Sequence, residues 1–219
     1  MPMDLPPGKT CAFVISFDFD AEEVWLAENP ENADRPGLLS QGSYGAKVGL
    51  GLVLDTLDHL GLQATFFTPG RVAERYPDQM REIVAHGHEL GHHGYTHTSP
   101  TKLSRAQELE ELLKGKAALE QFGTRVTGYR SPSWEVSSNT FELLTANGFE
   151  YSSSMMDDIK PYVHAAHKIV ELPVQWILDD APYFWFSSGS DWNRTIRSAQ
   201  DVQEIWREEF IGIRALGGL

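Results

Sequence analysis

The stretch CAFVISFDFD, residues 11–20, decides the fold. Its regular alternation and its aromatic and β-branched side chains predict a β-strand. Alternate residues of a strand share a face, so Ser16, Asp18 and Asp20 point one way while Phe17 and Phe19 point the other. The small residues suit the interior of a barrel and the bulky ones suit a layer of covering helices. The sequence therefore predicts a strand with two carboxylates at its carboxyl end.

Strand and helix signals alternate along the rest of the chain. Further strands are expected at 63–70, 88–91, 126–130, 149–154 and 168–178, and helices at 47–61, 76–87, 104–123, 140–148 and 199–218. A stretch rich in Gly, Pro and Asn at 28–45 is expected to be a loop. This alternation predicts an α/β protein with a parallel sheet, either open or closed into a barrel, and with its chemistry at the carboxyl ends of the strands. The 219 residues show no repeat or linker, so one domain, 1–219, is expected.

The apolar faces of two helices follow from helical spacing. In the helix at 47–61, which Gly61 is expected to close, the apolar face is assigned to Val48, Leu52, Leu57 and Leu60. In the helix at 104–123 it is assigned to Leu109, Leu112, Leu113 and Leu119.

Composition excludes several classes of partner. Lys and Arg number 18 against 31 Asp and Glu, a net charge of −13, which would repel a nucleic-acid backbone. No apolar run is long enough to predict a membrane-spanning helix. The lone Cys11 cannot form an internal disulfide, and the start MPMDLPPGKT lacks the basic and apolar regions of a signal peptide, so a cytoplasmic location is expected.

The carboxylates of Asp18 and Asp20 are expected side by side. Such a pair is costly unless one member is protonated or a cation lies between them. A metal ion would remove that cost. The alternative is an Asp-rich loop entry that caps the following segment.

Four histidines lie within ten residues in HELGHHGYTH, 88–97. His93 and His97 are four apart, a spacing that lets two imidazoles chelate one divalent ion, although His92 competes with His93 as the first ligand. Two His and one Asp leave coordination positions open for water and substrate, as in a catalytic site. This ligand set suits zinc, cobalt, iron and manganese, and zinc is expected because imidazole is its commonest ligand. The alternative is a set of surface or loop-capping histidines.

Two later stretches carry further candidates. In GYRSPSWE, 128–135, Arg130 ends a predicted strand and could orient a carboxylate, while Trp134 offers an aromatic wall. An ordinary surface ion pair is the alternative for Arg130. In LDDAPYFWF, 178–186, Asp179 and Asp180 open an aromatic cluster that could line a pocket or belong to the core.

Taken in order, SFDFD, HELGHHGYTH and YRSPSW resemble the motifs of the polysaccharide deacetylase family, carbohydrate esterase family four, with its NodB-like homology domain. The resemblance implies an irregular (β/α)7 barrel, here lacking its last strand, and hydrolysis of acetamide groups on sugars with one divalent metal, often zinc. It makes Asp18 the general base, held by Arg130, and makes Asp20, His93 and His97 the metal ligands. Tyr95, Trp134 and Asp180 are expected to bind substrate.

The sequence departs from the common family pattern in two places. Phe19 separates two aspartates that are usually adjacent, a form that resembles the peptidoglycan-deacetylase-like, allantoinase-like and cyclic-imide-hydrolysing branch, as do ATFFTPG and SYGAKVGLG. Family chains also carry a late histidine as general acid, whereas this sequence stops at Leu219 and neither His164 nor His167 matches that motif.

These departures keep two other functions open. One is a small-molecule amidohydrolase that opens a cyclic imide or ureide ring. The other is a metal- or carbohydrate-binding module without turnover. An unclosed sheet edge could also be covered by a second subunit in a homo-oligomer.

Overall fold

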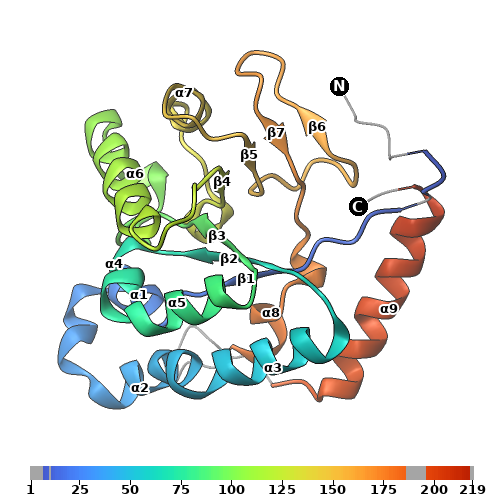
Figure 1. The fold of residues 1–219 in the computed structure, drawn as a ribbon, viewed down its shortest axis with the longest axis horizontal. Helices are drawn as coiled ribbons and strands as arrows, with labels where there is room; N and C mark the ends of the chain where they lie inside the picture. The colour runs from blue at the N-terminus through green and yellow to red at the C-terminus, as the bar shows by residue number, and fades with distance from the viewer. Residues whose placement is uncertain (1–6, 10, 186–195, 218–219) are drawn as a thin grey trace.

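Seven strands form one sheet in the order β1-β2-β3-β4-β5-β7-β6 (Figure 1). The computed structural model describes residues 7–9, 11–185 and 196–217. The strands are β1 (Ser16–Asp18), β2 (Thr65–Thr68), β3 (Glu89–His92), β4 (Gly128–Tyr129), β5 (Tyr151–Ser152), β6 (Tyr162–Val163) and β7 (Val170–Glu171). All neighbouring strands are parallel except β6, which pairs antiparallel with β7. Within the described residues β1 and β6 are not paired with each other, so the predicted α/β architecture is confirmed with an open sheet.

Nine α-helices among the described residues accompany the sheet. They are α1 (Glu23–Glu28), α2 (Pro36–Tyr44), α3 (Leu50–Leu60), α4 (Gly70–Arg75), α5 (Pro77–Ala85), α6 (Arg105–Glu120), α7 (Thr140–Ala146), α8 (Ala181–Phe184) and α9 (Ala199–Ala215). Short helical turns lie at η1 (Pro30–Asp34), η2 (Gly45–Gly49), η3 (Pro100–Lys102), η4 (Pro132–Trp134) and η5 (Trp176–Leu178). None of these helices combines the length and the apolarity needed to cross a membrane.

Local signals explain where the predicted helices begin and end. Helix α6 starts at a capping box in which Ser104 and Gln107 bond to each other's backbone N–H. Helix α3 closes, as expected, at Gly61, whose φ of 65° is a left-handed conformation that glycine adopts without strain. The sequence start MPMDLP, Phe186 and the two last residues, which were included in the sequence-based expectations, lie outside the described residues.

The expected loop at 28–45 is wrong, because it holds two helices. Asn29 accepts a hydrogen bond from the N–H of Glu31 and caps η1, and the prolines at Pro30 and Pro36 occupy first-turn positions where a missing N–H costs nothing. Helix α2 then runs through the π-turn η2 into α3. The sequence patterns also missed α1, α4, α8 and β6, which are too short to show periodicity.

The strand expected at 11–20 is shorter than its pattern. Only residues 16–18 pair with β2, in register with residues 65–67. The chain before β1 instead reaches α9, where the rings of Phe13 and Phe210 meet edge to face at 6.0 Å. Phe13 remains 70% exposed, so it is not covered as the strand pattern predicts.

The core lies between the sheet and its helices. The residues buried in it differ in part from the apolar faces predicted for α3 and α6. On α3 the buried side chains are Leu50, Leu54 and Leu57, whereas Val48, Leu52 and Leu60 are exposed. This helix carries aliphatic residues on two sides, so helical spacing alone could not choose the side that packs on the sheet. On α6 the expected burial of Leu112 and Leu119 is confirmed and Leu109 packs at the edge of the core, but Leu113 is exposed.

Leu119 and Leu113 of α6, one buried and one exposed, give a matched test of the packing. Leu119→Ala is expected to lower the free energy of unfolding by about 2–4 kcal/mol, because it leaves a cavity at a fully buried position. Leu113→Ala removes the same atoms at a side chain that is 48% exposed, and should change stability by less than about 0.5 kcal/mol. Urea unfolding of both variants measures this; equal losses would show that the face assignment is wrong.

Candidate metal centre

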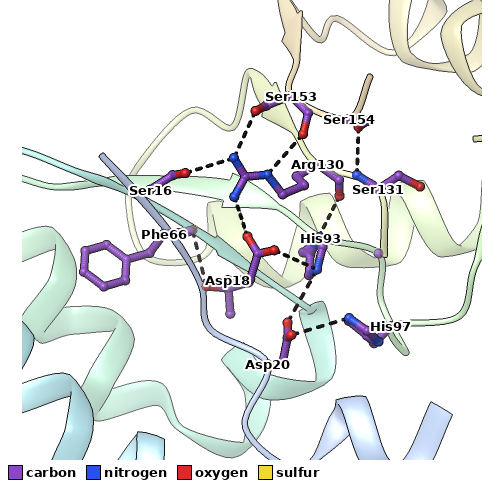
Figure 2. A network of polar contacts seen from close by, with 12 residues as sticks. Ser16, Asp18, Asp20, Phe66, His93, His97, Arg130, Ser131, Ser153 and Ser154 are labelled. Carbon is purple, nitrogen blue, oxygen red and sulfur yellow. Dashed lines mark hydrogen bonds and ion pairs between the residues drawn. The ribbon is translucent and has the colours of Figure 1, made fainter. Parts of the chain in front are cut away.

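The candidate site lies where the parallel strands end (Figure 2). Asp18 is the last residue of β1 and Asp20 follows two positions later; His93 follows β3 directly, and Arg130 follows β4 directly. His97 comes from the loop after His93. Parallel strands place their carboxyl ends at one edge of a sheet, which is how residues up to 112 positions apart meet there.

Three side chains converge as possible metal ligands: Asp20, His93 and His97. One ligand atom from each lies within 4.8 Å of the others. The Nε2 of His93 is 3.5 Å from Oδ1 of Asp20, and the Nε2 of His97 is 3.5 Å from Oδ2 of the same carboxylate. The side chains of the two histidines are 2% and 8% exposed, so their orientation is set by the protein.

The chemistry of these donors fits a divalent cation. The Nδ1 of His93 lies 2.8 Å from the carbonyl oxygen of Arg130 and donates its proton there, which leaves the lone pair of Nε2 facing Asp20. Burial lowers the pKa of His97 to about 4 and also lowers the pKa of His93, so both rings are neutral ligands at pH 7. The Oδ1 of Asp20 is buried without a hydrogen-bond donor, a deficit that a cation would meet.

Burial also dominates the ionisation of Asp20. It raises the pKa of this carboxyl to about 7, and the negative charge of Asp18 adds to the shift. Without a cation, Asp20 therefore takes up a proton at a much higher pH than an exposed aspartate does. A divalent ion between Asp20 and the two imidazoles would favour the ionised form.

Asp18 differs from Asp20 because it forms an ion pair with the side chain of Arg130. Burial raises its pKa, but the charge of Arg130 above all, and its hydrogen bond, outweigh that effect, so the pKa of Asp18 lies below its usual value. The Nη1 of Arg130 donates to Oδ1 of Asp18 at 2.7 Å. The other carboxylate oxygen, Oδ2, faces His93 at 3.7 Å.

The guanidinium of Arg130 is fixed by further hydrogen bonds and by an aromatic ring. Its Nη2 donates to the hydroxyls of Ser16 and Ser153 at 2.9 Å each, and its Nε donates to the carbonyl of Ser153 at 3.1 Å. The guanidinium carbon also lies 4.3 Å from the ring centre of Phe67. The surface ion pair considered as an alternative for Arg130 is therefore not what the structure shows.

His92 does not join the ligand group. Its Nδ1 accepts the N–H of Gly94 at 3.1 Å, and its Nε2 lies 3.1 Å from the carbonyl oxygen of Leu112. Both ring nitrogens are thus used inside the protein, and the ring packs on Tyr129. Of the two competing histidines, only His93 faces the carboxylates.

Glu111 fixes the loop that carries His97. Its carboxylate accepts the backbone N–H of Tyr95 at 3.0 Å and of Thr96 at 2.8 Å, and also the hydroxyl of Thr96. His97 has a φ of 57°, a left-handed conformation unusual for a residue with a side chain. These hydrogen bonds hold the turn in the conformation that directs His97 at Asp20.

The three residues expected to bind substrate lie in different surroundings. Trp134 is packed against Trp176, with ring centres 4.2 Å apart. Asp180 starts α8, and burial raises its pKa, to which the charge of Asp18 adds. Tyr95 instead donates its hydroxyl to Glu74, 3.1 Å away, a residue outside the ligand group.

Sequence patterns missed the residues that support the site. Ser153 and Ser154 follow β5, and the hydroxyl of Ser154 accepts the N–H of Ser131 at 3.0 Å. Asp179, seen in the sequence only as a pocket entry, has its pKa raised to about 6, chiefly by burial and further by Asp180 and Asp18. The only sequence feature that could have indicated these supporting residues is the run of serines, 152–154, at the carboxyl end of a predicted strand.

Comparisons with known proteins show the family to which the chain belongs. The sequence model of the family described as polysaccharide deacetylase matches residues 47–152. A peptidoglycan deacetylase of Helicobacter pylori is 32% identical over 93% of this chain and 78% of its own length. The chain belongs to the polysaccharide deacetylase family.

One further relative and two solved structures are also similar to this chain. The peptidoglycan deacetylase-like protein FGM2 of Gibberella zeae is 26% identical over 96% of the chain and 71% of its own length. A crystal structure from Mycobacterium smegmatis, assigned to the polysaccharide deacetylases, superposes with a TM-score of 0.94 at 40% identity, covering 99% of this chain and 77% of that one. The PuuE allantoinase, at 21% identity and a TM-score of 0.82 over 96% of this chain and 75% of its own, shares the fold.

The raised pKa of Asp20 predicts a stability cost. A folded-state pKa of about 7 against an unfolded value of 3.8 destabilises the metal-free protein progressively from pH 4 to 7 and fully above it. Asp20→Asn should therefore raise the unfolding free energy of chelator-treated protein at pH 8 by on the order of 1 kcal/mol, with the gain vanishing near pH 4. Urea unfolding at both pH values tests this; a variant less stable than the parent at pH 8 would contradict it.

Proposed function

We propose that this protein is a metal-dependent deacetylase that hydrolyses the acetamide groups of N-acetylated sugars in a polysaccharide. The observation that carries the proposal is the convergence of Asp20, His93 and His97 beside an arginine-paired Asp18, in a chain of this family. The name of the Helicobacter pylori relative supports peptidoglycan as the polymer. Zinc as the metal and a cytoplasmic location remain predictions.

Each residue would have a distinct role. A divalent ion bound by Asp20, His93 and His97 would lower the pKa of water and polarise the amide carbonyl. Asp18 is the general base in this proposal, because its lowered pKa keeps it ionised at neutral pH and its Oδ2 faces the ligand group. Arg130 orients Asp18 by holding the opposite oxygen, Oδ1.

Substrate would be held by the surface next to these groups. We propose Trp134, whose buried ring packs against the half-exposed ring of Trp176, as part of an aromatic wall for a sugar ring. Asp180 is proposed as a polar contact, because Asp18 influences its pKa and the two carboxyls are therefore close enough to interact. Tyr95 stays a prediction, with its hydroxyl engaged by Glu74.

Two substitutions separate metal binding from catalysis. Asp18→Asn should retain near-equimolar zinc but lower acetate release by at least about a hundredfold, since the amide cannot accept the proton. His97→Ala should lose both the metal and the activity, because it removes one of three ligands. Zinc content after dialysis and acetate release from N-acetylglucosamine oligomers are the two readouts. A normal rate in Asp18→Asn would remove Asp18 from the role of base.

A substrate comparison tests the reaction class. The zinc-loaded protein is expected to release acetate from N-acetylglucosamine oligomers or peptidoglycan, with no detectable ring opening of allantoin or a cyclic imide under the same conditions. Acetate is followed by a coupled assay and ring opening by loss of ultraviolet absorbance. Ring opening without acetate release would overturn the proposal in favour of a small-molecule amidohydrolase.

A further inference from the structure

The backbone that carries the ligand Asp20 runs directly against helix α2. A Cβ atom added to Gly42 would lie 2.4 Å from the carbonyl oxygen of Ala21, 2.6 Å from its carbonyl carbon and 2.8 Å from the nitrogen of Glu22. These contacts are with backbone, which cannot move aside as the end of a flexible side chain can. Gly42 thus allows the helix to lie on the peptide between Ala21 and Glu22.

That peptide has an unusual conformation. Ala21, next to Asp20, has a φ of 45°, in the left-handed region that a residue with a Cβ atom rarely adopts. The N–H of Glu23 donates to the carbonyl of Asp20 at 2.9 Å and closes the turn. A turn of this kind persists only where its surroundings hold it.

The opposite side of the same peptide is anchored to the segment after β2. The Oε1 of Glu22 accepts the hydroxyl of Tyr76 at 2.6 Å, and its Oε2 accepts Nη1 of Arg75 at 3.2 Å. Residues 21–22 are therefore fixed between α2 on one side and the end of α4 on the other. Helix α2 in turn packs against α1, whose Trp25 carbonyl accepts the side-chain N–H of Asn32 at 2.8 Å.

We infer that Gly42 is a positioning residue for the metal ligand Asp20, and that α2 serves as a brace that sets where its carboxylate lies. This inference rests on the proposed metal site. Asp20 is the ligand that needs such support, because its Oδ1 is buried and none of the described residues donates a hydrogen bond to it. Functional groups must be held within about 0.5 Å of their productive geometry, and the added methyl group would force α2 and the turn at residues 21–22 apart.

Zinc affinity of the metal-stripped full chain tests the inference. Gly42→Ala is expected to bind zinc about tenfold more weakly than the parent, the size of effect seen when the support of a ligand is lost. Gly45→Ala is the matched control, since it adds the same methyl group to the same helical run at a glycine with nothing within 4 Å, and its affinity should stay within about twofold. Competition with a chromophoric chelator gives the affinities, and circular dichroism verifies the folding of each variant.

The outcomes separate this inference from the proposed function. If the parent binds zinc, His97→Ala does not, and folded Gly42→Ala binds as the parent does, only the brace is overturned. If the parent binds no zinc, or if His97→Ala binds as well as the parent, the proposed metal site falls and the brace with it. Should Gly42→Ala not fold, Asn32→Ala decides, because it removes the hydrogen bond that ties the turn before α2 to the carbonyl of Trp25 in α1 and so loosens α2 without changing charge. A loss of about threefold or more supports the brace, and an unchanged affinity overturns it.

Discussion

The mutual repulsion of Asp18 and Asp20 is the constraint around which the site is arranged. Two carboxylates on one side of a strand end cannot both be ionised at low cost unless each has a positive partner. Arg130 supplies that partner for Asp18, and its charge outweighs the effect of burial on the pKa of this group. Among the described residues no such side chain pairs with Asp20, and burial raises its pKa to about 7. In the proposed function, one carboxylate is thereby kept ready to accept a proton, and the other is left to a cation.

The parallel sheet makes this division possible. Ser16 begins the short strand β1, whereas Arg130 follows β4 and Ser153 follows β5, and the guanidinium links all three strands through its hydrogen bonds. The carbonyl of Arg130 also fixes the imidazole of His93, so one residue orients both the proposed base and one proposed ligand. A change at Arg130 would consequently be felt in both groups together, which makes it a poor probe of either role alone.

The sequence allowed much of this arrangement to be predicted, because its strongest signals are local. Alternation in residues 11–20 put Asp18 and Asp20 on one face, and the four-residue spacing put His93 near His97. Contacts between distant segments had no such signal. Nothing in the pattern separated His92 from His93, since only the folded chain offers the Leu112 carbonyl that occupies the His92 ring. Likewise, the brace by Gly42 depends on a helix in a stretch whose Pro and Gly content predicts a loop.

The same features that build the site also weaken the fold. Ala21 and His97 hold left-handed backbone conformations, each costing on the order of 1–3 kcal/mol, and both lie beside or within the proposed ligand group. Against a total stability of about 5–15 kcal/mol for a domain, these costs are large. A cation that binds only the folded protein would restore stability in proportion to the logarithm of its concentration over its dissociation constant. In this protein, metal binding and folding should therefore be coupled through the two turns that carry the ligands.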